Sequence, residues 1–256
     1  YYAEARNTTT GCVSATRTAV TATVHDVPSP PTPSGGIAVC GSGSVTLTAI
    51  PGQGQTIDWY SSASGGNALV SGSPSFTTPV IFNPTTYYAE ARNLVTNCVS
   101  SVRTPVTAVV NKVPAAPSVI GASRCGTGSV ILNASAFAGE TIDWYVVPSG
   151  GLAVSTNASS YNTGTLSATT VYYAETRNIS SGCTSATRTP VTATILSLSF
   201  STTSVTICSS EAPYNWNGQN YSSEGTYNVT LTNSVGCDSI ATLNLQVIQN
   251  PQAFTV

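Results

Sequence analysis

The chain has 256 residues, of which 7% are charged, and its formal net charge is -2 at pH 7. An ordinary soluble domain carries about 25% charged residues, so we expect a polar but nearly uncharged surface. No cluster of Lys and Arg offers the basic face that nucleic acid requires, and no apolar run reaches the roughly 18 residues of a membrane span. These features argue against a nucleic-acid partner and a membrane span.

One segment recurs along the chain. Residues 87–93 have the sequence YYAEARN, and almost the same letters stand at residues 1–7 and 172–178. A fixed period of about 85 residues is typical of tandem small domains. We therefore expect four parts: 1–26, the final strands of a truncated module; 27–112, the first module; 113–196, the second module; and 197–256, a last, shorter module of a different repeat type.

Proline-rich segments stand at the predicted module borders. Residues 27–33 contain four prolines, and residues 113–117 repeat the device with two. Proline is excluded from sheet interiors, so these segments are expected to run as stiff polyproline II connectors. The last border, near residues 196–198, lacks prolines.

Within each module, apolar residues alternate with polar ones. Val45, Leu47 and Ala49 alternate with threonines, and Ile57 and Trp59 share one phase in the next segment. Period 2 is the pattern of half-buried strands, and turn residues recur every 8 to 12 positions without helical periodicity. The pattern predicts an all-β antiparallel sandwich of about seven strands, with Trp59 and Trp144 in the cores.

Alternation also predicts which side chains leave the core. The residues between the apolar positions are expected to point outward: Asp58, Tyr60, Tyr88, Glu90 and Arg92. Arg103, on the closing strand, is then placed to pair with Glu90 across this face. Such a stripe serves either to keep strand register or, repeated along a fibre, to contact ligands or neighbouring fibres.

Seven cysteines occur at repeated positions and indicate an oxidising compartment. Cys40 and Cys98 are 58 residues apart, as are Cys125 and Cys183. Equal spacing predicts one disulfide in each whole module, and Cys208 with Cys237 is expected to form a third. Cys12 occupies the position of Cys98 in the truncated module, so its expected partner lies before Tyr1.

The sequence contains no pattern typical of a catalytic or metal-binding site. His25 is the only histidine and stands beside the first connector, without an equivalent in later copies. The carboxylates recur once per module, which suits sheet architecture better than one active site. No cysteine pair has the short spacing of a structural zinc loop. We expect no enzymatic activity, no metal and no cofactor.

A tryptophan between two cysteines, followed by a strand headed by tyrosine, resembles the immunoglobulin-like sandwich. YYAEARN, then a Gly-Cys or Asn-Cys turn and a strand with the sequence RTPVTA, is similar to Ig-like repeats of large exported proteins of Bacteroidota. The segments YNWNG and GTY of the last module are similar to another repeat of these proteins. The resemblance implies a type IX-secreted adhesin or filament, and Asp238-Ser239-Ile240 resembles the O-glycosylation motif of that phylum.

The leading hypothesis is a non-catalytic stalk or filament segment of an extracellular, cell-surface protein. Its expected partners are neighbouring modules of the same or identical chains, with glycans or surfaces as ligands. The alternative is a set of carbohydrate-binding or spacer modules attached to a secreted hydrolase, in which exposed tyrosines such as Tyr60, Tyr88 and Tyr145 stack on sugars. Ser239 is the predicted O-glycosylation site, and an ordinary turn explains its motif equally well.

Overall fold

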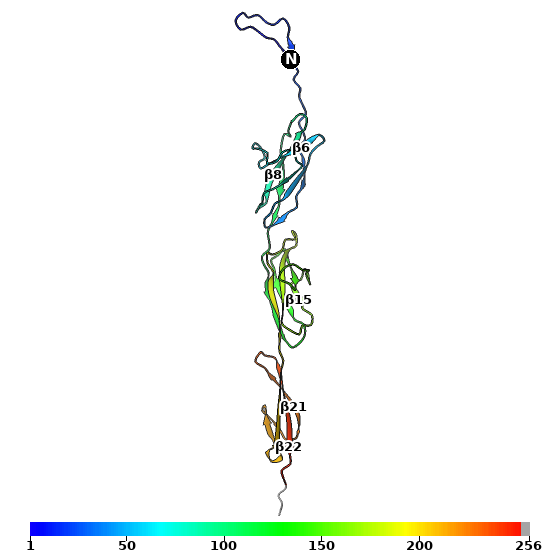
Figure 1. The fold of residues 1–256 in the computed structure, drawn as a ribbon, viewed down its shortest axis with the longest axis vertical. Coiled ribbons are helices and arrows are strands. Elements are labelled where there is room, and N and C mark those ends of the chain that lie inside the picture. Colours follow the sequence, from blue (N-terminus) through cyan, green and yellow to red (C-terminus); the bar gives the residue numbers. More distant parts are fainter. Residues whose placement is uncertain (252–256) are drawn as a thin grey trace, which may run out of the picture. The chain divides into compact units, whose positions relative to one another are not determined.

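The computed structural model describes residues 1–251, and apart from a short 3-10 turn η1 (Ser209–Glu211) their regular elements are all strands. The chain divides into two compact units, Tyr1–Lys112 and Val113–Val256. Figure 1 shows the strands of the whole modules grouped as small sandwiches. The described residues contain no helix long and apolar enough to cross a membrane. The predicted all-β, tandem sandwich class is confirmed.

The first twenty residues form a hairpin without a core. Strand β1 (Tyr2–Ala3) pairs antiparallel with β2 (Thr18–Ala19), and every residue up to Val20 is exposed. Tyr1 is 90% exposed, whereas Tyr87 at the equivalent position of the first module is 7% exposed. The same letters are therefore buried only where a second sheet covers them.

The first module is a sandwich of two three-stranded sheets. One sheet has the order β3-β5-β7 and the other β6-β8-β9. The remaining strands, β4 and β10, form a short parallel pair. Their bounds are β3 (Thr32–Gly35), β4 (Val39–Cys40), β5 (Thr46–Ile50), β6 (Gln55–Tyr60), β7 (Ser75–Thr77), β8 (Thr85–Asn93), β9 (Thr104–Ala108) and β10 (Val110–Asn111).

The second module repeats this plan with a larger sheet. Its two sheets have the orders β11-β13-β15 and β12-β17-β16-β14, with β12 parallel to β17. The strand bounds are β11 (Ser118–Ile120), β12 (Ala122–Cys125), β13 (Ile131–Ser135), β14 (Glu140–Tyr145), β15 (Ser160–Asn162), β16 (Thr170–Asn178) and β17 (Thr189–Leu196).

The cores consist of the apolar positions that the alternation predicts. Ile57 and Trp59 of β6 are fully buried, and Trp59 stacks on Phe76 with ring centroids 5.9 Å apart. The indole N–H of Trp59 donates to the Ser73 carbonyl at 3.0 Å, so the buried polar atom is satisfied. Trp144 holds the same place in the second module and donates to the Ala158 carbonyl at 2.7 Å.

The last module has a smaller core. Strands β18 (Ser199–Cys208), β22 (Asp238–Ile248) and β21 (Gly225–Thr232) form one sheet in this order, and β19 (Tyr214–Trp216) pairs with β20 (Gln219–Tyr221). The core contains three buried residues, Ile207, Leu243 and Leu245. Partly buried aromatic side chains pack against them: Tyr214, Trp216, Tyr221 and Tyr227.

The proline connectors pack onto the modules that follow them. Pro28 and Pro31 are buried, as are Pro114 and Pro117. The Thr104 hydroxyl donates to the Pro31 carbonyl at 2.8 Å, and the equivalent bond in the second module joins Thr189 to Pro117 at 3.1 Å. Prolines three residues apart lie on one face of a helix with three residues per turn, so a polyproline II segment buries both. The connectors are thus part of their modules.

Candidate functional site

One cysteine marks the place where the chain leaves each module. We call Cys40, Cys125 and Cys208 the exit cysteines. Each ends a strand that runs parallel to the last strand of its module, and the residues opposite them in register are Asn111, Leu196 and Ile248. Each exit cysteine therefore lies beside the final residues of its module.

A second cysteine lies in the turn between the last two strands of a module. We call these the turn cysteines: Cys12, Cys98, Cys183 and Cys237. In every copy the backbone N–H of an asparagine that begins the turn donates to the cysteine carbonyl, at 2.8 to 2.9 Å. The asparagine side chain also accepts backbone N–H groups, as Asn93 does from Val95 and Thr96 at 2.9 Å. The turns of Cys12, Cys98 and Cys183 share one hydrogen-bonding scheme, and the Cys237 turn is a version one residue shorter, in which Asn233 Oδ1 accepts from the Cys237 N–H.

A disulfide joins the exit cysteine of the second module to the turn cysteine of the last. Cys125 and Cys237 are 112 residues apart in sequence, and their Cα atoms are 5.6 Å apart. Asn233, which begins this turn, donates a side-chain N–H to the Ser197 carbonyl at 3.0 Å in the segment between the two modules. Cys40 and Cys183 are also disulfide-bonded. Cys12, Cys98 and Cys208 carry free thiols.

This arrangement corrects the predicted pairing within modules. Cys125 bonds Cys237 and so neither Cys183 nor Cys208 has its predicted partner, and Cys98 is free instead of bonded to Cys40. The reason is the parallel strand pair, which places the exit and turn cysteines at opposite ends of a module. Strands β9 and β10, at the end of the first module, together run from Thr104 to Asn111, roughly 23 Å at 3.3 Å per residue. A disulfide requires Cα atoms within about 7 Å.

A second repeated feature is a buried cluster around Arg103. The Arg103 Nε atom lies 3.1 Å from Glu90 Oε1, and its guanidinium carbon lies 3.3 Å from the centroid of the Tyr60 ring. The Tyr60 hydroxyl donates to Glu90 Oε2 at 3.0 Å. Arg103 Nη1 also donates to the Ser62 and Gly65 carbonyls at 2.9 and 2.7 Å. We call this cluster the arginine clamp, because it fastens the loop after β6 to the outer face.

The second module has the same arginine clamp. Arg188 lies 3.4 Å from Glu175, covers the Tyr145 ring at 3.3 Å, and donates to the Val147 and Gly150 carbonyls at 2.9 and 2.7 Å. The predicted charge pair forms, but it is buried: the side chains of Arg103 and Glu90 are 9% and 12% exposed. The repeated Gly-Gly pairs at residues 65–66 and 150–151 were the sequence signal for the clamped loop.

Asp58 forms a second ion pair on the same face. Its carboxylate accepts from Arg92 Nε at 2.7 Å, from Arg92 Nη2 at 3.1 Å and from the Gly72 N–H at 2.8 Å. Burial raises the pKa of Asp58, but the hydrogen bonds from Arg92 and Gly72 outweigh it and hold the pKa below its ordinary value. Asp143 makes the equivalent pair with Arg177, with Nε to Oδ2 at 2.6 Å, and its pKa is lowered in the same way. These carboxylates stay ionised and serve the fold.

The clamped tyrosines do not offer the ring faces that sugar binding requires. A guanidinium lies over the rings of Tyr60 and Tyr145, and both hydroxyls donate to glutamates. Burial, and then the bond to Glu90, raises the pKa of Tyr60; burial and Glu175 do the same for Tyr145. Tyr88, opposite Tyr60 in register, is half-buried.

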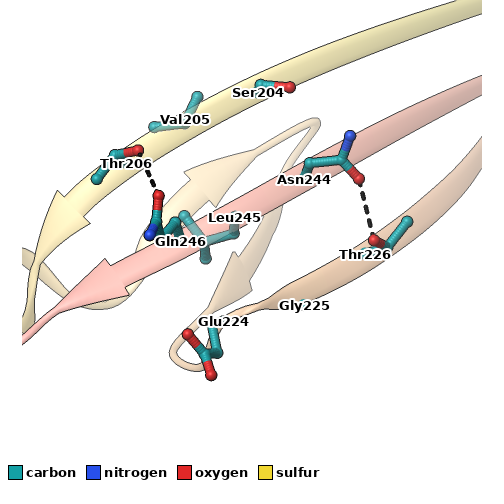
Figure 2. Close-up of a pocket in the computed structure, with 9 residues that line it drawn as sticks. All are labelled: Ser204, Val205, Thr206, Glu224, Gly225, Thr226, Asn244, Leu245 and Gln246. Carbon is teal, nitrogen blue, oxygen red and sulfur yellow. Dashed lines mark hydrogen bonds between the residues drawn. The ribbon is translucent and has the colours of Figure 1, made fainter.

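An open hollow of about 630 Å³ lies on the last module. Figure 2 shows that its lining comes from β18, β22, β21 and Glu224 just before β21, and that Thr206 donates to Gln246 and Thr226 to Asn244. These bonds measure 3.3 and 3.0 Å. The nine lining residues include no aromatic side chain. Four of the polar lining side chains thus pair with each other across the sheet.

The remaining singled-out residues stand apart from these clusters. His25 is exposed in a segment without regular structure, and among the described residues no three His, Cys, Asp or Glu side chains gather as metal ligands would. Ser239 is the second residue of β22, half-buried, between Leu231 of β21 and Ser199 of β18. Its O-glycosylation stays a prediction.

Comparisons with known proteins agree with the sandwich architecture. A family model described as "Ig-like domain CHU_C associated" matches residues 28–111 and 114–196. Among curated proteins no match was found.

Similar solved structures are sandwich arrays with low sequence identity. The I-band fragment I67-I69 from titin is 12% identical over 86% of this chain and 99% of its own, with a TM-score of 0.36. Fibronectin(III)-like modules of Clostridium thermocellum CbhA are 15% identical over 65% and 94%, with a TM-score of 0.37. Chicken CNTN1 FN1-FN3 domains are 14% identical over 75% and 76%, with a TM-score of 0.34.

Proposed function

The chain belongs to the family of Ig-like domains described as CHU_C-associated, and from this premise we propose that it is a non-catalytic stalk segment of a repetitive, exported surface protein. Two copies of one module in tandem suit a part that spans distance. The resemblance to exported repeats of Bacteroidota supports secretion by the type IX route, with filament or adhesin as the role of the whole protein.

The observation that carries the proposal is the disulfide across a module junction. The Cys125–Cys237 bond connects two modules covalently, and stable disulfides belong to oxidising, extracellular compartments. A bond between modules carries load past the folded chain between its ends. This is a property that a stalk uses and that an isolated binding domain does not need.

The nearly uncharged composition and the clamped outer faces support the same role. Buried ion pairs on both whole modules hold loops on the sheets, and among the described residues no three His, Cys, Asp or Glu side chains gather as metal ligands would. Neither the hollow of the last module nor the covered tyrosines favours carbohydrate binding. Stalk function is therefore the one candidate that we develop.

Single-molecule pulling on the oxidised and reduced chain tests the load-bearing role. In the oxidised chain, force passes from Cys125 to Cys237, and the 112-residue separation hides roughly 380 Å of chain from extension. The measurement uses a Cys40→Ser with Cys183→Ser background, because these two cysteines are also disulfide-bonded and reduction would release them as well. In this background, reduction is expected to lengthen the total extension by about this amount. Adding Cys125→Ser should make the oxidised chain extend like the reduced one, whereas adding Cys208→Ser should leave the oxidised extension unchanged. Equal extensions in both redox states would refute the load path.

The proposed surface location has a separate test. Antibodies raised against the purified chain are expected to label intact cells of the source organism without permeabilisation. Labelling that requires permeabilised cells would place the protein inside and remove the surface role.

A further inference from the structure

We propose that Cys208 and Cys98 are the two halves of a further intermodule disulfide site: Cys208 accepts the turn cysteine of a following Ig-like module, and Cys98 accepts the exit cysteine of a preceding one. The partner is thus a module of the same kind, which a second copy of this chain supplies. The site makes the chain a link that joins covalently at two positions.

The first half of the site is Cys208. It ends β18, which runs parallel to β22 over ten register pairs, and it lies opposite Ile248. Cys125 ends β12 and lies opposite Leu196 in the same parallel relation to β17. Cys125 is bonded to the module that follows it. Cys208 occupies the same position with an exposed free thiol.

The second half of the site is Cys98. The N–H of Asn93 donates to the Cys98 carbonyl at 2.9 Å, as that of Asn233 donates to the Cys237 carbonyl at 2.8 Å. Asn233 Oδ1 accepts backbone N–H groups of its turn, including that of Cys237 at 2.9 Å, and Asn93 Oδ1 accepts those of its own turn. Cys237 is bonded to the module before it. Cys98 stands at the end of a similar turn, one residue longer, with a free, half-buried thiol.

Pairing inside the same module is not available to Cys208. Cys237 directly precedes β22, and Cys208 lies opposite the other end of this strand. The strand Asp238–Ile248 spans roughly 33 Å at 3.3 Å per residue. Disulfide geometry demands Cα atoms within about 7 Å, so the partner of Cys208 comes from another module.

The bond forms by thiol–disulfide exchange with a low-molecular-weight disulfide as oxidant. The Cys208 thiolate attacks one sulfur of the oxidant and releases one small thiol, giving a mixed disulfide. The thiolate of the partner turn cysteine then attacks the Cys208 sulfur and releases the second small thiol. Both protein thiols lose their protons, and the two electrons reside in the reduced oxidant.

Two matched variants of the full chain test the pairing. One keeps Cys208 as its free thiol (Cys12→Ser with Cys98→Ser), and the other keeps Cys98 (Cys12→Ser with Cys208→Ser) and carries a size tag. Mixed in equal amounts with oxidised glutathione, they are expected to form mostly the mixed dimer, seen on non-reducing gels. Mass spectrometry should find the Cys208 peptide bonded to the Cys98 peptide.

Random oxidation would give the two like dimers as about half of the product, and that result would overturn the proposal. So would a product consisting of glutathione adducts alone. A third variant that keeps Cys12 and Cys98 (Cys208→Ser), mixed with the variant that keeps Cys208, tests the hairpin: preferential capture of Cys208 by Cys12 over Cys98 would reassign the turn half of the site. The inference concerns assembly and not load, so the pulling result on the Cys125–Cys237 bond stands or falls separately.

Discussion

Two arginines at equivalent positions of the repeat have different surroundings in this chain. Arg17 and Glu4 repeat the pair Arg103 and Glu90, but their side chains are 66% and 33% exposed and lie 3.5 Å apart. In the first module the pair is covered by the loop it fastens. The same two residue types therefore form ion pairs of different energy, because burial by the loop strengthens one pair and solvent weakens the other.

Replacing Arg103 with Ala is expected to destabilise the first module by about 3 to 5 kcal/mol, since Glu90 would be left buried and unpaired. The measurement is the unfolding free energy of that module in denaturant. Arg188→Ala should cost a similar amount in the second module. Arg17→Ala is the matched control and should cost less than about 1 kcal/mol. An equal loss for Arg17 and Arg103 would contradict the clamp.

Asp58 and Asp143 make stability dependent on acid pH. Their pKa values are lowered in the folded state, so the unfolded chain takes up protons at higher pH than the folded chain does. The stabilisation is complete above the ordinary Asp pKa of about 3.9 and is lost as pH falls through the folded value. The double variant Asp58→Asn with Asp143→Asn should be less stable at pH 7 and lose less between pH 5 and pH 2.

The matched control for this profile is Asp26→Asn, because Asp26 is exposed in the segment before the first module. It should keep the wild-type dependence of unfolding free energy on pH. A double variant with an unchanged acid slope would contradict the assignment of these two carboxylates.

Much at the residue scale could be predicted from period-2 alternation. It placed Ile57, Trp59 and Ala89 in the core, and all three are fully buried. Alternation also sent Asp58 outward, yet Asp58 is 4% exposed because the loop near Gly72 covers it. A strand pattern assigns a face to a side chain but says nothing about a loop that later folds over that face.

At the scale of elements, the parallel pairing of an early strand with the last strand distinguishes the modules. The parallel pair has two register positions in β4-β10, four in β12-β17 and ten in β18-β22. Parallel pairing was not predictable from the sequence, because period 2 gives a strand its buried side and not its neighbour. The cysteines at residues 40, 125 and 208 depend on this pairing for their position.

These strand pairs predict an order of mechanical strength. Tension on the two ends of a module pulls its parallel strand pair in shear, so all register positions of that pair resist together. In the reduced chain, the first module is expected to open at the lowest force and the last module at the highest, despite its small core. The measurement is single-molecule pulling, in which the length of chain released identifies the module that opens and the force of its opening is recorded. Earliest rupture of the last module would show that its core, and not the strand pair, sets its strength.

At the scale of the whole molecule, the sequence predicted tandem sandwiches but not how they are joined. Cysteine spacing fixes which positions carry thiols and leaves the connectivity open. Equal spacings within the whole modules favoured bonds inside them, whereas Cys125 bonds Cys237 in the next module. Pairing between modules follows only from the strand arrangement, because this arrangement puts the two cysteines of one module at its opposite ends.

The arginine clamps and their neighbouring ion pairs also bear on resistance to trypsin-like proteases. The chain has eight Lys and Arg residues, and trypsin-like proteases cut only after these two. Arg92, Arg103, Arg177 and Arg188 are engaged in ion pairs on the whole modules. Cleavage needs an accessible, locally unfolded segment. The low charge of this chain therefore leaves few bonds for such enzymes, and half of those lie in strands or turns that the clamps hold in place.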